Sequence, residues 1–251
     1  MPSVSSHYST ENLNLTFATK VVLVIDYQDG LFNLVRDIQP TKLKQNLLCH
    51  AALAKLFNLP IILTTTADTG PNGPIMKEVR EMHPNAPFIR RTGEVNAFDN
   101  PEFRAALEAT GRKQVIIGAL LTEVCTFESV SLSPSPCGME ILCANFGHFS
   151  LGTTFPALSM RAEGYDVWAN IHGSGSADKE TSDHAYQRMR QAGVHVLDSL
   201  SIAMEMMRDW RNTPGANELL PFMDQYVPSY GLLGRAHASA TENALAGANK
   251  K

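Results

Sequence analysis

The stretch "KVVLVID", residues 20–26, decides the fold of this 251-residue chain. Its aliphatic residues, 21–25, are unbroken and are flanked by Lys20 and by an acid, Asp26. Two further runs of this kind follow, "PIILTTT" at 60–66 and "KQVIIGALL" at 113–121. Continuous apolar runs of this length are typical of strands buried on both faces, which occur in parallel sheets covered by helices.

Helical patterns separate these strands. Residues 41–58 carry apolar residues at helical spacing, and Pro60 closes that segment. Residues 100–111 predict a compact helix with Asn100 as N-cap. Further along, 153–171 predicts a helix, a turn and a strand, and 179–210 predicts a helix, a short strand at 194–197 and a last amphipathic helix. Strands that alternate with helices predict an α/β fold, a three-layer α-β-α domain with a mostly parallel, doubly wound sheet.

One domain is expected over residues 19–211. Residues 1–18 form an N-terminal extension in this interpretation, and 212–251 form a C-terminal tail. Because the tail contains Pro214, Pro221 and Pro228, it is expected to be extended, to make subunit contacts and then to become disordered.

Composition excludes several classes of function. The net charge is −4, from 25 acids and 21 bases, so there is no basic surface for a nucleic-acid partner. No apolar run approaches the roughly 18 residues that span a membrane, and the N-terminus has no secretory signal pattern. Four cysteines in a chain of this length do not form a disulfide framework. We therefore expect a cytoplasmic protein with reduced thiols.

The carboxyl ends of the strands are where ligands bind in an open parallel sheet. That rule selects Asp26, the loop at 64–74 and the turn at 122–125. No glycine-rich phosphate loop follows the first strand, which argues against a nucleotide- or flavin-binding domain. A lone cysteine is most often a small buried hydrophobe, but Cys125 follows a strand where the start of a helix would lower its thiol pKa.

Asp26 and Cys125 together suggest nucleophilic catalysis. The carboxylate can take the thiol proton, and a nearby cation can hold the thiolate. Arg90 and Arg91 in "PFIRRTGEVNAFDN" are the candidate cations, although paired arginines are more often a solvated face. A catalytically silent oligomeric scaffold remains the alternative from a different class.

Five stretches of the chain resemble the isochorismatase-like cysteine hydrolases. They are "VVLVIDYQDGLFNLVRDI", "TTTADTGPNGP", "PFIRRTGEVNAFDNPEF", "ATGRKQVIIGALLTEVC" and "FPALSMRAEGYDVW". They are most similar to the YcaC-type branch, relatives of nicotinamidases and N-carbamoylsarcosine amidases. The resemblance runs from about residue 20 to about 230, with one interruption, and implies a homo-oligomer with a small-molecule substrate.

The resemblance also implies site residues and a reaction. Asp26 falls on the family's general base, Cys125 on its nucleophile, and Arg91 on a position usually held by lysine. A guanidinium stays protonated throughout the ordinary pH range and cannot shuttle protons, so proton transfer rests on Asp26. The implied reaction is attack of the Cys125 thiolate on a small amide or related carbonyl compound, formation of a thioester, and its hydrolysis.

Further positions follow from the same resemblance. Backbone N–H groups in the turn Leu121, Thr122, Glu123, Val124 and Cys125 would hold the oxyanion, with a cis peptide expected between Leu121 and Thr122. The candidates for the substrate pocket are Gln28, Asn96 and Phe98. Nicotinamidase-type members bind a metal through an Asp-x-His pattern, and "TTTADTGPNGP" has no histidine, so neither a metal nor another cofactor is expected.

Two departures from the family pattern stand out. His172 lies where the family usually has an aspartate, and a surface histidine is the simpler interpretation. Residues 127–153 form a 27-residue excess directly after the nucleophile, and their removal would restore "TEVCTTFPALSMRAEGY". The excess is either a lid over the site or an unspliced intron translated in frame.

This insertion is expected to affect the chemistry of Cys125. If it replaced the first turns of the following helix, the thiolate would lose about 0.3–1 kcal/mol of stabilisation. The chain as written is then expected to be weakened or inactive.

Overall fold

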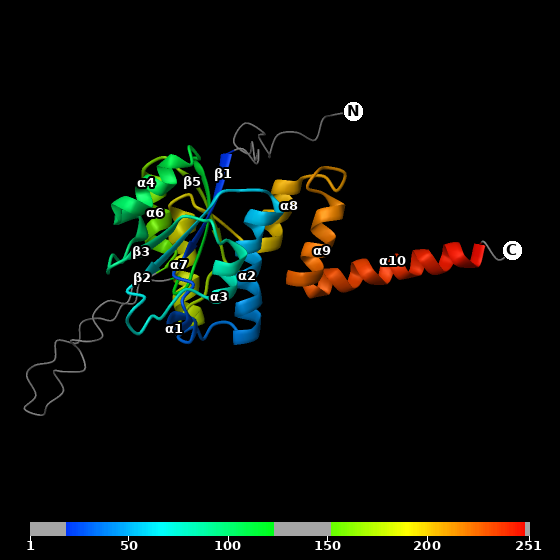
Figure 1. The fold of residues 1–251 in the computed structure, drawn as a ribbon, viewed down its shortest axis with the longest axis horizontal. Coiled ribbons are helices and arrows are strands. Elements are labelled where there is room, and N and C mark those ends of the chain that lie inside the picture. Colours follow the sequence, from blue (N-terminus) through cyan, green and yellow to red (C-terminus); the bar gives the residue numbers. More distant parts are fainter. Residues whose placement is uncertain (1–18, 123–151, 249–251) are drawn as a thin grey trace, which may run out of the picture.

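A parallel six-stranded sheet forms the centre of the computed structural model, which describes residues 19–122 and 152–248 (Figure 1). The strands lie in the order β3-β2-β1-β4-β5-β6. Their bounds are β1 Lys20–Ile25, β2 Ile61–Thr66, β3 Phe88–Arg91, β4 Gln114–Ala119, β5 Asp166–Asn170 and β6 His195–Leu197. The expected three-layer α/β architecture is confirmed.

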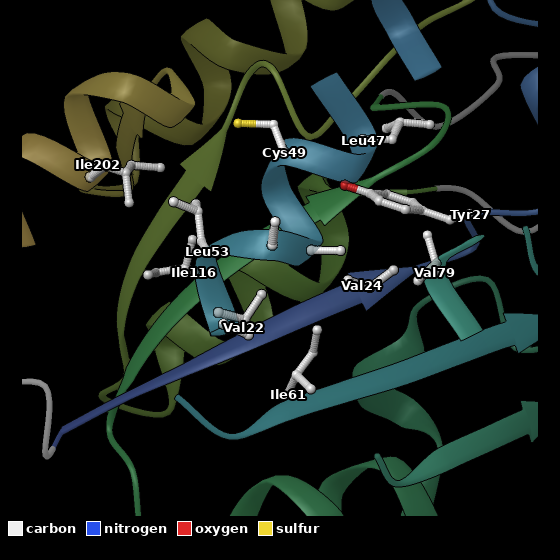
Figure 2. Close-up of a cluster of buried hydrophobic side chains, with 14 of the residues drawn as sticks. Val22, Val24, Tyr27, Leu47, Cys49, Leu53, Ile61, Val79, Ile116 and Ile202 are labelled. Atoms are coloured by element: carbon white, nitrogen blue, oxygen red, sulfur yellow. The ribbon is translucent and has the colours of Figure 1, made fainter. Parts of the chain in front are cut away.

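Helices cover both faces of the sheet (Figure 1). The strand β1 supplies apolar side chains to both faces. Val22 and Val24 pack on one face with α2 (Pro40–Leu56), α3 (Lys77–Met82) and α8 (Ser199–Met207); Figure 2 shows this cluster. Val21 and Leu23 pack on the other face with α4 (Pro101–Ala109), α6 (Thr154–Ala162) and α7 (Lys179–Gln191). Successive side chains of a strand point to opposite faces, so a strand between two helical layers must be apolar throughout.

The predicted helices and strands before residue 211 agree closely with the structure, and four short elements of the described residues were missed. Asn100 is the N-cap of α4, as predicted, and its side chain accepts the N–H of Phe103 at 3.0 Å. The missed elements are β3, α1 (Asp29–Phe32), α3 and the 3-10 helix η2 (Ala97–Asp99). The strand β3 has the sequence FIRR, in which two arginines conceal the apolar pattern.

The C-terminal tail corrects an expectation. Instead of an extended segment, residues after 211 form α9 (Ala216–Tyr226) and α10 (Pro228–Ala248). Leu219, Phe222 and Met223 of α9 belong to the core on the α2 side, so the domain continues beyond residue 211. Pro228 occupies the first position of α10, where a proline needs no hydrogen-bond partner.

The last helix lies largely outside this core. In Figure 1, α10 projects away from the sheet and helices as an arm. In the part of the chain that the structure describes, no helix is both long and apolar enough to cross a membrane. The N-terminal extension 1–18 falls outside the described residues.

Candidate active site

A buried ion pair stands at the carboxyl edge of the sheet. Asp26 directly follows β1, and Arg91 is the last residue of β3, with β2 between them. The Arg91 Nη2 atom lies 2.5 and 2.6 Å from the two carboxylate oxygens of Asp26, and both side chains are inaccessible to solvent. The guanidinium therefore reaches across the end of β2 to close the pair.

Several groups hold the guanidinium in this position. Its Nε donates to the hydroxyl of Thr64 at 3.0 Å, and its Nη1 donates to the carbonyl of Glu94. The N–H of Asp26 donates to the Thr64 carbonyl at 2.9 Å. A buried charge pair is tolerated when further hydrogen bonds satisfy its remaining polar atoms, which is the arrangement here.

The backbone turns out of the sheet at Asp26. Its φ is 57°, in the left-handed region that aspartate visits more readily than most residues. The Gln28 N–H then donates to the Asp26 carbonyl at 2.7 Å. This turn ends β1 and places the carboxylate at the sheet edge.

Arg91, and not Arg90, is the cation that contacts Asp26. Arg90 is largely exposed, and its Nε donates to Asp68 at 2.6 Å. Neighbouring residues of a strand point to opposite faces, so only one of the two arginines can reach the buried carboxylate.

The turn after β4 differs from the expectation in two respects. The Leu121–Thr122 peptide is not cis, because the cis bond of the described residues joins Thr213 and Pro214. Leu121 instead has a φ of 57°. The Thr122 N–H donates to the Gly175 carbonyl at 3.0 Å, so it is not available to an oxyanion in this structure. Glu123, Val124 and Cys125 lie outside the described residues.

The helix that was expected near the nucleophile begins at this turn. The first residue of α6, Thr154, donates its N–H to the Thr122 carbonyl at 3.3 Å and its hydroxyl to the same carbonyl at 2.7 Å. A Cβ on Gly152 would lie 1.9 Å from the Leu121 carbonyl oxygen, so only glycine fits there. The condition considered above, loop in place of the first turns of this helix, is not met from Thr154 onward, because the start of α6 is held against Thr122.

The loop after β5 holds the chain segments that follow β1 and β4 at this edge of the sheet. The Tyr27 hydroxyl donates to the Gly173 carbonyl at 2.6 Å, and Gly175 holds Thr122 as described. The Ser174 hydroxyl is 3.0 Å from the hydroxyl of Thr153, the N-cap of α6. His172, expected at the surface, is half-buried, and burial lowers its pKa while the nearby Asp198 opposes that shift.

A neutral histidine underlies this loop and was not found by sequence reasoning. His50 is fully buried; its Nε2 lies 3.0 Å from the Leu23 carbonyl and its Nδ1 lies 3.0 Å from the amide nitrogen of Asn170. Burial lowers the pKa of His50 to about 4, so the ring donates from Nε2 and accepts at Nδ1. Residues 120 apart in sequence make this contact, and no local pattern indicates it.

The three candidates for the substrate pocket make contacts within the chain. The Gln28 amide accepts the Thr66 N–H and donates to the Thr66 carbonyl, both at 3.0 Å, which extends the pairing of β1 with β2. Asn96 caps the short turn at Phe98 and donates to Ser159 at 3.0 Å. Phe98 is a core residue, 1% exposed. Their role toward a substrate stays a prediction.

The described residues contain no group of three or more His, Cys, Asp or Glu side chains placed to hold a metal ion. The expectation of a metal-free site is a separate matter and stays a prediction.

Comparisons with known proteins agree with this architecture. A family model described as "Isochorismatase domain" matches residues 20–131. The chain is 38% identical over 221 residues to the Escherichia coli protein "Probable hydrolase YcaC", an alignment that covers 88% of this chain and 92% of that one.

Two solved structures share the fold over nearly their whole length. The E. coli YcaC gene product, described as an octameric hydrolase of unknown specificity, has 37% identity and a TM-score of 0.76, covering 96% of this chain and 99% of that one. YcaC from Pseudomonas aeruginosa, with hexane-2,5-diol and covalent acrylamide, has 35% identity and a TM-score of 0.75, covering 89% and 96%. The chain therefore belongs to the isochorismatase family, among the relatives of the YcaC hydrolases.

Proposed function

We propose that this protein is a cysteine hydrolase of a small amide or related carbonyl compound, and that Cys125 is its nucleophile. The observation that carries the proposal is the buried Asp26–Arg91 pair at the carboxyl edge of the sheet. Burial of two charges is costly, and clusters of this kind are retained at functional sites more often than elsewhere.

The proposed reaction has two halves. Asp26 accepts the thiol proton of Cys125, and the thiolate attacks the substrate carbonyl to form a tetrahedral anion. Collapse of that anion gives a thioester and expels the amine, which takes up the proton that Asp26 holds. Water, activated by Asp26, then hydrolyses the thioester to the acid and regenerates the thiol. A carboxylate oxygen carries two lone pairs, so a hydrogen bond from Arg91 does not by itself prevent Asp26 from taking the thiol proton.

Arg91 acts electrostatically in this proposal. Its three hydrogen-bonding nitrogens are occupied by Asp26, Thr64 and Glu94, and this arrangement fixes its charge beside the carboxylate. The positive end of α6 at Thr122 adds to the field that favours a thiolate and an oxyanion. The covalent acrylamide carried by the P. aeruginosa relative supports the proposal, because attachment of an electrophile requires a reactive nucleophile.

The test is a pair of cysteine variants. We expect Cys125→Ala to abolish hydrolysis of small amides, and a slow substrate to leave an acyl group on Cys125 that peptide mass spectrometry detects. Cys49→Ala is the matched control, because Cys49 is buried and burial raises its pKa to about 12, which keeps it an unreactive thiol. Undiminished turnover by Cys125→Ala would exclude the proposal.

We also propose that the C-terminal helices make subunit contacts in a homo-oligomer. The octameric E. coli relative supports this assembly. Leu232 and Leu233 at the start of α10 are 62% and 67% exposed, and Tyr230 beside them is 50% exposed. Burying large apolar side chains of this kind stabilises an interface by about 1.5–3 kcal/mol each. Leu232→Asp with Leu233→Asp should shift the mass measured by light scattering toward the protomer, and an unchanged mass would contradict this role for α10.

A further inference from the structure

Two buried polar atoms at the active-site edge have no hydrogen-bond partner in the described structure. They are the hydroxyl oxygen of Thr66 and the side-chain oxygen of Asn72. Both residues are almost fully buried, at 0% and 1% exposure. An unpaired buried polar atom is destabilising, and in native proteins such atoms are rare and call for an explanation.

Both atoms adjoin a single backbone carbonyl at the end of β2. The Asn72 side-chain nitrogen donates to the Thr66 carbonyl at 3.0 Å. This bond fixes the orientation of the amide, because the reverse orientation would place two oxygens against each other. The Asn72 oxygen is therefore an acceptor that points away from the carbonyl.

Thr66 stands next to the Asp26–Arg91 pair. It is the register partner of Arg91 across β2 and β3. It also shares a sheet face with Thr64, two residues earlier, whose hydroxyl accepts from the guanidinium of Arg91. The Thr66 hydroxyl therefore lies on the guanidinium side of the sheet, one step closer to the carboxyl edge.

Of the other buried atoms without partners in the described residues, the Ser176 hydroxyl also lies at the carboxyl edge, in the loop after β5, and none belongs to β2 or to the loop that follows it. The remaining two belong to Asn46 and Arg161, which lie on α2 and on α6. The coincidence of two unpaired oxygens with the proposed catalytic edge is what points to a ligand.

We infer that the Thr66 hydroxyl and the Asn72 oxygen form a subsite for the N–H2 group of a primary amide or carbamoyl substrate. Each oxygen accepts one N–H, and the substrate carbonyl is then left for the nucleophile. The subsite rests on the proposed function and narrows its substrate class. A neutral N–H2 group matches two oxygens that each accept one N–H, and it adds no third charge beside the buried Asp26–Arg91 pair.

The test compares two small electrophiles with the same vinyl group. Acrylamide carries an N–H2 group, and methyl acrylate carries a methoxy group in its place. In either reaction a thiolate sulfur bonds to the terminal vinyl carbon, the double bond is consumed, the neighbouring carbon takes a proton from solvent, and nothing leaves. The measured quantity is the alkylation rate of the fast-reacting cysteine with acrylamide divided by its rate with methyl acrylate. This ratio is normalised by the same ratio for a free thiol in solution.

The informative variant is Thr66→Val, which removes the hydroxyl and preserves the shape of the side chain. We expect the normalised ratio to fall on the order of tenfold, which corresponds to the loss of one hydrogen bond to a polar ligand group. We expect the Tm to stay the same or rise, because this hydroxyl makes no bond within the described chain. Thr66→Ser should restore the ratio, and Asn72→Leu should lower it as well.

Thr65→Val is the matched control, because its hydroxyl points to the other face and donates to Asp68 at 3.3 Å. It should leave the ratio unchanged. A fast-reacting cysteine whose ratio is the same in wild type and Thr66→Val would overturn the subsite and leave the proposed nucleophile standing. A lowered Tm for Thr66→Val would also overturn it, by showing a structural role for the hydroxyl. Absence of any fast-reacting cysteine in the wild type would overturn the proposed function and the subsite together.

Discussion

Replacing Arg91 with methionine removes the cation of the buried pair and leaves most of the side-chain volume in place. The Asp26 carboxylate then loses the counter-charge that Arg91 supplies, and both groups are inaccessible to solvent in the native chain. Thr64 and the Glu94 carbonyl each lose a donor as well. The variant therefore tests whether the ion pair contributes to the free energy of unfolding.

The expected cost is about 3–5 kcal/mol of unfolding free energy, the range for breaking a buried ion pair by removing one partner. Asp26→Asn in the same chain removes the other charge, so the double variant has no unpaired buried ion. We expect the double variant to be more stable than the sum of the two single costs predicts, by an interaction energy of about 2–3 kcal/mol.

Urea unfolding followed by circular dichroism measures these differences at a fixed protomer concentration, because assembly shifts the apparent stability. Arg90→Met is the matched control, since the Arg90 side chain is 65% exposed and water can solvate the carboxylate edge it leaves, and it should cost about 1 kcal/mol or less. A cost below about 1 kcal/mol for Arg91→Met, with additive single and double variants, would refute the reasoning.

Three further predictions test other parts of the structure. The pKa of His50 is about 4 in the folded chain and near 6.5 in the unfolded chain. The free energy of unfolding should therefore be unaffected by His50 above pH 6.5 and should fall by about 3 kcal/mol as the pH falls toward 4. His50→Gln should remove this pH dependence of the unfolding free energy in urea titrations. Asn100→Ala should cost about 1 kcal/mol in the same assay, because it removes the bond to the Phe103 N–H, and no loss would exclude the cap. A chain without residues 127–153 should give a circular dichroism spectrum of unchanged sheet content and a Tm no lower than that of the full chain; a lower Tm would show that the fold depends on the segment.

The sheet was predictable because its central strands are uninterrupted apolar runs. Val21 and Val22 face different helical layers, so burial on both sides imposes the pattern that the sequence displays. The strand β3 lies at the sheet edge and carries Arg90 and Arg91, so no such pattern exists there. The helices after residue 211 were missed because prolines were given more weight than the apolar residues Leu219 and Phe222, which pack on the core.

The site was predictable only in part. The rule for carboxyl ends selected Asp26, and the family resemblance selected Arg91, but the residues alone left Arg90 and Arg91 as equal candidates. Buried polar contacts such as His50 with Asn170 join positions 120 residues apart, and a contact at that separation leaves no periodic trace. Gln28 illustrates the same limit, since its polar atoms complete the pairing of β2 instead of standing free in a pocket.

The contact between Thr122 and Thr154 bears directly on the 27-residue excess. Because Thr126 and Thr153 are the same residue type, a chain without 127–153 still has a threonine before Thr154 to serve as N-cap and to meet Ser174. In that chain the bond from the Thr154 N–H to the Thr122 carbonyl would join residues five apart, which is the spacing of a single wide helical turn. The start of α6 beside Thr122 is therefore compatible with both chain lengths, whereas the loss of helix-dipole stabilisation at Cys125, which lies outside the described residues, stays a prediction. Any difference in activity between the two chains would then have to come from residues 123–151 themselves and not from a displaced helix.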